Sequence, residues 1–190
     1  MDFYEVIHSR RAIRKYKADM VPRETILKIL DAANWAPSGM NMQQWEFIVV
    51  SGEKKKEMGE SYGRFAEVYT ADWEDAARKA AFLQFARSFG GAPIIVVALT
   101  RGSKDETTRK MHLESVSAAF ENLLLAACAE GLGSCWMTGP LRDEASIRRI
   151  LEIPEDREIV ALTPIGYPDM KAEPPARLDP ELKNKVRWVD

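Results

Sequence analysis

Residues 94–99 form a continuous apolar run, Ile-Ile-Val-Val-Ala-Leu, which follows the turn-forming segment Gly90-Gly91-Ala92-Pro93. Such a run of aliphatic, mostly β-branched side chains after turn residues predicts a β-strand. Because the run contains no polar position, the strand is expected to be buried on both faces of its sheet. This feature constrains the fold most strongly, since it requires a sheet that is covered on both sides.

The rest of the pattern predicts one domain, residues 1–190, without an internal repeat or a dividing linker. Further strands are predicted at residues 45–50 and 158–165, and a short strand or extended segment is predicted at residues 132–137. Helices are predicted from Val21-Pro22-Arg23-Glu24 to Trp35, from Glu53, across residues 61–88 with a break at 69–71, and at residues 112–130 and 143–151. Asp72 is expected to cap the helix after the break, residues 101–109 to form a surface loop, and Gly131 to end the long helix in a left-handed conformation.

The composition is that of a globular chain, with 29% charged residues, a formal net charge of -2 and a pI near 5.8. This balance argues against a nucleic-acid partner, which normally meets a basic face. The longest apolar run, residues 123–129, is too short to span a bilayer, and no signal peptide is expected from the first residues. Two cysteines and two distant histidines indicate neither a disulfide framework nor a metal site, so a reducing cytoplasm is the expected location.

A basic cluster occupies residues 10–15, where four arginines and lysines fall within six positions. A planar guanidinium group binds phosphate or carboxylate bidentately, so Arg10, Arg11 and Arg14 are a candidate anion clamp. Ile13 interrupts the cluster and predicts one packed side and one cationic side. For an isolated run of this kind a solvated basic turn is the commoner interpretation, and these residues alone leave both open.

A second candidate segment, residues 36–45, reads Ala-Pro-Ser-Gly-Met-Asn-Met-Gln-Gln-Trp and lies between a predicted helix and a predicted strand. Its Ser, Asn and Gln side chains offer donors and acceptors together, as the polar edge of a heterocycle requires, although a capped turn is the commoner explanation. No Walker loop, nucleophile elbow or zinc spacing is present, and Gly131-Leu132-Gly133 follows a helix rather than the strand that a dinucleotide loop needs. A chain with so little chemistry of its own favours a cofactor that performs the difficult step.

Two further features, the aromatic residues of segment 61–89 and Cys135, each allow two interpretations. Aromatic residues crowd residues 61–89 in greater number than one amphipathic helix needs, and core packing is preferred over cover for a ligand; they are Tyr62, Phe65, Tyr69, Trp73, Phe82, Phe85 and Phe89. Cys135 has no basic neighbour in sequence that would lower its thiol pKa. We therefore expect a buried packing position rather than a catalytic thiol.

Several segments taken together resemble the FMN-dependent nitroreductase family, in its small single-domain form. The segments are residues 10–14, 36–45, 121–127 (Glu-Asn-Leu-Leu-Leu-Ala-Ala), 131–136 (Gly-Leu-Gly-Ser-Cys-Trp) and 164–168 (Pro-Ile-Gly-Tyr-Pro), followed by Arg177. They cover almost the whole chain in the family's order. Ala12 replaces the usual serine, Gln44 replaces a proline, and Pro175 stands where some members carry a second basic residue near the phosphate. The first and third of these changes remove possible phosphate contacts, so a lower FMN affinity is expected.

The resemblance implies an α+β fold with a mainly antiparallel sheet surrounded by helices. It implies an intertwined homodimer that exchanges its C-terminal strand, residues 186–189, and two FMN sites that each use both chains. The arginines of the basic cluster and Arg177 would hold the phosphate, ribityl and pyrimidine parts of FMN. By motif match, the cofactor-binding residues are Arg10, Arg11, Ala12, Arg14, Pro37, Ser38, Asn41, Gln43, Met137, Thr138, Gly139 and Arg177.

The resemblance also implies the activity of an oxidoreductase that needs no protein nucleophile and no metal. NADH or NADPH would deliver hydride to flavin N5 and leave, and a small electron-poor acceptor would then be reduced, in a ping-pong sequence. The acceptor would be a nitroaromatic, a quinone, an activated alkene or another flavin, and Arg14 would stabilise the anionic reduced flavin. The alternative is a non-catalytic flavin-binding store or redox sensor; neither a nucleic acid nor a membrane is expected as a partner.

Overall fold

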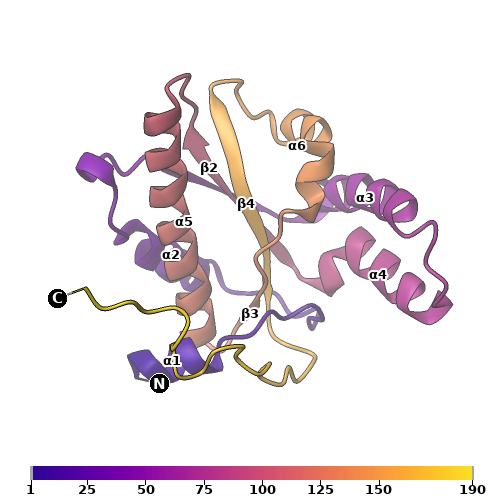
Figure 1. Ribbon diagram of the computed structural model, residues 1–190. Coiled ribbons are helices and arrows are strands. Elements are labelled where there is room, and N and C mark those ends of the chain that lie inside the picture. The colour runs from indigo at the N-terminus through magenta and orange to yellow at the C-terminus, as the bar shows by residue number, and fades with distance from the viewer. Residues whose placement is uncertain (1, 190) are drawn as a thin grey trace.

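The computed structural model describes residues 2–189 and contains an antiparallel sheet with helices on both faces (Figure 1). The strand order is β1-β2-β4-β3, in which β1 is Trp45–Val50, β2 is Ile94–Arg101, β4 is Arg157–Gly166 and β3 is Gly133–Ser134. All three neighbouring pairs are antiparallel, and one bulge, at Val160 of β4, shifts the register between β2 and β4. The predicted α+β class is therefore confirmed.

The helices divide between the two faces of the sheet (Figure 1). On one face lie α2 (Arg23–Asn34) and α5 (Glu106–Ala129), and on the other lie α3 (Gly52–Tyr69), α4 (Ala76–Ser88) and α6 (Glu144–Leu151). The short helix α1 (Phe3–Ser9), which the sequence interpretation missed, contacts α5. Short 3-10 turns complete the chain: η1 is Gly39–Asn41, η2 is Phe89–Gly91 and η3 is Gly139–Asp143.

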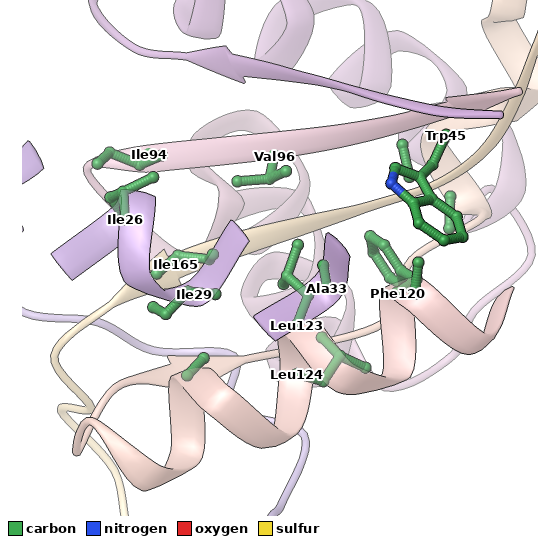
Figure 2. Packing of buried hydrophobic residues seen from close by; sticks show 14 of the residues in the cluster. Ile26, Ile29, Ala33, Trp45, Ile94, Val96, Phe120, Leu123, Leu124 and Ile165 are labelled. Atoms are coloured by element: carbon green, nitrogen blue, oxygen red, sulfur yellow. The ribbon is translucent and has the colours of Figure 1, made fainter. Parts of the chain in front are cut away.

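β2 is buried on both faces, as its sequence predicts. Ile94, Val96 and Ala98 join the cluster beneath α2 and α5, where Figure 2 shows Ile94 and Val96 facing the helices. The alternate residues Ile95, Val97 and Leu99 join the cluster beneath α3, α4 and α6. One short strand thus supplies side chains to two separate cores.

The structure corrects three assignments at the ends of elements. α4 is capped by Asp75 rather than Asp72, since the Asp75 carboxylate accepts the Arg78 N–H at 2.9 Å. The loop predicted at residues 101–109 is confirmed only for residues 102–105, because Arg101 ends β2 and α5 already begins at Glu106. The first turn of α5 is mostly exposed, so it lacks the apolar stripe on which a sequence assignment depends. The strand predicted at residues 132–137 is reduced to Gly133–Ser134, because β3 pairs with only the last two residues of β4.

Two predictions for the C-terminal part of the chain, at Gly131 and at residues 186–189, have different outcomes. Gly131 ends α5 with a φ of +73°, which confirms the predicted left-handed conformation. Residues 186–189, expected to form a strand, have no strand partner within the described chain, and Val186, Trp188 and Val189 are exposed.

The core beneath α2 gives a matched test of stability. Ile29 is fully buried in that cluster, whereas Leu27, two residues earlier, is 55% exposed. Ile29→Ala should lower the free energy of unfolding by about 2–5 kcal/mol, because it leaves a cavity, and Leu27→Ala should change it by no more than about 0.5 kcal/mol. Urea denaturation followed by circular dichroism measures both, and equal losses in the two variants would contradict the packing.

Candidate functional site

The basic cluster is held as an extended segment along the edge of the sheet. The Ile13 N–H donates to the Ser134 carbonyl oxygen of β3 at 2.9 Å, and the Tyr16 N–H donates to the Gly90 carbonyl oxygen at 2.9 Å. Ile13 and Tyr16 are buried, whereas Arg14 between them is exposed. This confirms the expected packed side and cationic side, and it excludes a freely solvated turn.

Two glycines allow the cluster to approach the sheet this closely. A Cβ atom at Gly133 would lie 2.8 Å from Ile13, and one at Gly90 would lie 2.1 Å from the Arg14 carbonyl oxygen. Gly90 also has a φ of +69°, which L side chains rarely adopt. Ala12 completes the docking as a parallel bridge to Ser134. These contacts fix where the arginines stand.

The three arginines have different surroundings. Arg10 Nε lies 3.8 Å from a carboxylate oxygen of Glu121 on α5. Arg11 Nη1 donates to the carbonyl oxygens of His8 at 2.7 Å and Arg10 at 2.8 Å, while its Nε is buried without a partner. A buried donor without an acceptor costs free energy, so Arg11 is prepared to receive an anionic oxygen. Arg14 instead extends into a cavity.

This cavity, of about 1160 Å³, lies between the basic cluster and the aromatic side of α3 and α4. Its walls include Tyr69, Trp73, Phe82 and Phe85. Tyr62 and Phe89, in contrast, are buried in the core. Both interpretations of the crowded aromatic segment therefore apply, each to different residues; the ones that line the cavity can cover a ligand.

Residues 137–139 pack against β4 and α3, and none of them lines the cavity. Met137 is buried and bridges Leu162 of β4 through two backbone hydrogen bonds of 2.9 and 3.1 Å. Gly139 lies against Tyr62 of α3, since a Cβ atom there would be 2.7 Å from the tyrosine oxygen. Thr138 between them is exposed. The close fit of Gly139 against Tyr62 leaves no room for a side chain at that position.

Two titratable groups lie near these residues. Burial raises the pKa of the Cys135 thiol, and the positive charges of Arg14 and Arg10 oppose that rise without overcoming it. Burial likewise raises the pKa of Tyr62 to about 12. The Cys135 thiol therefore stays protonated near neutral pH and lacks the thiolate character of a nucleophile. Its position is the buried one that the sequence predicts.

The polar loop and Arg177 lie elsewhere in this chain. Within the described chain, Arg14 alone of the predicted cofactor-binding residues lines the cavity; Arg10, Arg11, Ala12 and residues 137–139 do not, and neither do Pro37, Ser38, Asn41, Gln43 and Arg177. In Figure 1 the loop is on the α5 side of the sheet, whereas α3 and α4 are on the other. One protomer therefore brings together only part of the predicted site.

The polar loop has a defined shape of its own. Asn41 and Gln43 have positive φ values of 54° and 48°, and the Ser38 hydroxyl accepts the Gln43 N–H at 3.0 Å. The loop contacts α5, where the Gly39 N–H donates to the Ser115 hydroxyl at 3.2 Å. The amide group of Gln44 is buried, and neither its nitrogen nor its oxygen has a partner. The loop thus contains a buried amide that no group of the described chain satisfies.

The sequence interpretation missed two cationic residues of the cavity. Lys15 lines it and forms an ion pair of 2.8 Å with Asp169, beyond β4. Arg78 lines it from the first turn of α4. Nothing in the local pattern distinguishes Arg78 from other exposed helical arginines, and only the fold places it opposite Arg14's segment.

Residues 2–189 contain no group of three His, Cys, Asp or Glu side chains placed to hold a metal ion. No helix within this range has both the length and the apolar character that crossing a membrane requires.

Comparison with known proteins identifies the family. The model of the nitroreductase family matches residues 7–167, so the chain belongs to the nitroreductase family. It is 34% identical over 191 residues to a Methanothermobacter thermautotrophicus protein whose name proposes an NADH dehydrogenase/NAD(P)H nitroreductase, covering 99% of this chain and 88% of that protein. It is also 30% identical over 174 residues to the iodotyrosine deiodinase of Thermotoga neapolitana, covering 87% and 88%.

A solved structure supports the same assignment. The FMN-dependent nitroreductase from Clostridium difficile R20291 superposes with a TM-score of 0.74 at 27% identity, covering 99% of both chains. The antiparallel sheet between two helical layers is therefore the nitroreductase fold.

The two cysteines allow a direct test of burial. Cys128 is partly exposed and Cys135 is buried with a raised thiol pKa. Iodoacetamide at pH 8 should modify Cys128 in the native protein and leave Cys135 largely unmodified, because the reactive species is the accessible thiolate. Mass spectrometry of peptides measures both sites, with protein unfolded in urea as the control in which both react. Faster labelling of Cys135 than of Cys128 would contradict the assigned environment.

Proposed function

We propose that the protein is an NAD(P)H-dependent FMN oxidoreductase that acts as a single domain in the cytoplasm and reduces small electron-poor acceptors in a ping-pong sequence. The observation that carries this proposal is the juxtaposition of the docked arginine cluster with a large aromatic cavity, in a chain of the nitroreductase family. The acceptor would be a nitroaromatic, a quinone, an activated alkene or a flavin.

The residues present fit FMN. Arg11 has a buried Nε donor without a partner, which a phosphate oxygen would satisfy, and Arg10 and Arg14 add positive charge beside it. The cavity exceeds the ordinary size of a small-molecule pocket, so it has room for an isoalloxazine ring and a second small molecule. When bound, FMN would supply the hydride chemistry, accepting hydride from NAD(P)H at N5 and returning it to the acceptor.

The chain's own residues would bind FMN, orient it and tune its reactivity. Arg14 extends from the docked segment into the cavity, where its fixed positive charge would favour the anionic form of a reduced flavin. Tyr69, Trp73 and Phe82 would exclude water from the ring face. Met137, Thr138 and Gly139 would approach through backbone groups, since Gly139 offers no side chain. Ala12 would contribute its backbone only, without the hydroxyl of the usual serine.

A homodimer would complete the site. The loop with Pro37, Ser38, Asn41 and Gln43 lies on the other side of the sheet and does not line its own chain's cavity, so these residues would serve the site of the partner. Large exposed apolar residues support such an interface; they are Phe3, Tyr4, Trp35, Leu178, Trp188 and Val189. Arg177 and the C-terminal residues 186–189 would reach the partner by strand exchange.

Two alternatives lead to different measurements. A flavin store or redox sensor would bind FMN but would not turn over NAD(P)H with an acceptor. The similarity to iodotyrosine deiodinases favours reductive dehalogenation as a second candidate activity. Anaerobic titration of the purified holoprotein with NADH or NADPH, followed by addition of a nitroaromatic or of iodotyrosine, separates the three, because only an oxidoreductase returns to the oxidised spectrum with product formed.

The phosphate assignment is tested by Arg11. Arg11→Ala should raise the dissociation constant of FMN by tenfold or more, since a charge-assisted hydrogen bond contributes about 1.5–3 kcal/mol. Arg177→Ala should act in the same direction if the tail returns to the phosphate. Quenching of FMN fluorescence measures affinity, and Arg101→Ala, which removes an exposed charge at the end of β2, is the control. An Arg11 variant with wild-type affinity would refute the assignment.

The dimer is tested by truncation. Ending the chain at Lys185 removes the exposed apolar Val186, Trp188 and Val189. Dimerisation and flavin retention should both weaken, because the site is proposed to need two chains. Analytical ultracentrifugation with absorbance at the flavin wavelength measures both. A full-length protein that sediments as a monomer with stoichiometric FMN would contradict the two-chain site.

A further inference from the structure

Arg78 is a cation of the cavity wall that no carboxylate neutralises. Its guanidinium carbon lies 4.4 Å from the ring centroid of Trp73, the arrangement of a cation–π contact. Asp75, the nearest acid in sequence, receives the backbone N–H of Arg78 as the helix cap. Within the described chain the Arg78 side chain forms no ion pair and no hydrogen bond, so its planar set of donors is available to a ligand.

The lining of the cavity carries one sign of charge. Arg14, Lys15 and Arg78 contribute positive charges, and no acidic residue belongs to the described lining. Lys15 is paired with Asp169, and Arg14 is assigned to the flavin. Arg78 is therefore the cation left for a second ligand, and it belongs to α4 rather than to the basic cluster.

Next to Arg78 the rings form a compact aromatic surface. The ring centroids of Tyr69, Trp73 and Phe82 are 5.9 Å (Tyr69–Trp73), 5.5 Å (Trp73–Phe82) and 5.8 Å (Tyr69–Phe82) apart. All three residues line the cavity. A planar aromatic molecule can pack against such a group while an attached anion meets the guanidinium fork.

We propose that the electron acceptor is an aromatic anion, a ring bearing a carboxylate or a comparable group, which Arg78 holds by a charge-assisted hydrogen bond. This inference rests on the proposed oxidoreductase function and names the substrate class of its acceptor step. An amino acid fits less well, because its ammonium group would meet no carboxylate in the lining. NAD(P)H is also an aromatic anion that enters the cavity, so the test must separate the two half-reactions.

The experiment uses the FMN-loaded protein and two acceptors of nearly equal shape, 4-nitrobenzoate and 4-nitrobenzamide. Because the substituents also change how easily the nitro group is reduced, the quantity measured is the benzoate-to-benzamide ratio of kcat/KM in wild type and variant. Arg78→Gln should lower this ratio by about tenfold, the effect of losing a charge-assisted contact. Added salt should lower kcat/KM for the benzoate and not for the benzamide.

The matched control is Lys79→Gln, which removes the same charge from the next residue of α4. Lys79 does not line the cavity; its Nζ donates to the Ala71 carbonyl oxygen at 3.2 Å. This variant should keep the wild-type ratio. Calorimetric titration of the oxidised holoprotein with benzoate and benzamide supplies a readout besides turnover: benzoate should bind more tightly in wild type, and Arg78→Gln should remove the difference.

The outcomes separate this inference from the function on which it rests. If no acceptor is reduced while benzoate binds through Arg78, the proposed oxidoreductase fails and the anion site stands. If both acceptors are reduced and Arg78→Gln leaves the ratio unchanged, the oxidoreductase stands and the anion site is wrong. A variant defect confined to flavin reduction by NAD(P)H in stopped flow would assign Arg78 to the dinucleotide and overturn its role toward the acceptor.

Discussion

The structure depends on the burial of β2 on both faces. Its alternate side chains belong to two clusters on opposite sides of the sheet, so neither helical layer can form without the other side being covered as well. Burial of apolar area is worth roughly 25 cal/mol per Å², and a strand with six apolar residues in two cores links the stability of both layers. The α2–α5 layer and the α3–α4–α6 layer are thereby fixed relative to one another.

The candidate site is a consequence of that arrangement at one edge of the sheet. The basic cluster docks along β3, and η2, the turn that leads into β2, receives the backbone of Tyr16. Gly90 and Gly133 permit contact distances that any side chain would prevent. Arg14 therefore stands at the junction between the sheet edge and the α3–α4 layer, where it lines the cavity. The packing of the sheet edge thus also determines where the charged groups lie.

The polar groups of the predicted site lie on two sides of the sheet. One protomer holds the arginine cluster at an aromatic cavity, and it presents the polar loop of residues 36–45 on the other side of the sheet. A site completed by two chains would account for both observations, and it would couple flavin retention to assembly. The exposed apolar tail lies on a surface that such an assembly would have to cover.

The sequence by itself determined the apolar strand, the long helix with its Gly131 end, the family, and the two-sided character of the basic cluster, because these depend on local periodicity and on motifs. It did not determine the start of α5, whose exposed polar first turn has no apolar stripe. It also did not separate Tyr62, which is core, from Tyr69 and Trp73, which line the cavity. Only the tertiary structure placed Arg78 in the cavity wall, because the packing of α4 against α3, and not the neighbours of Arg78 in sequence, sets where its side chain points.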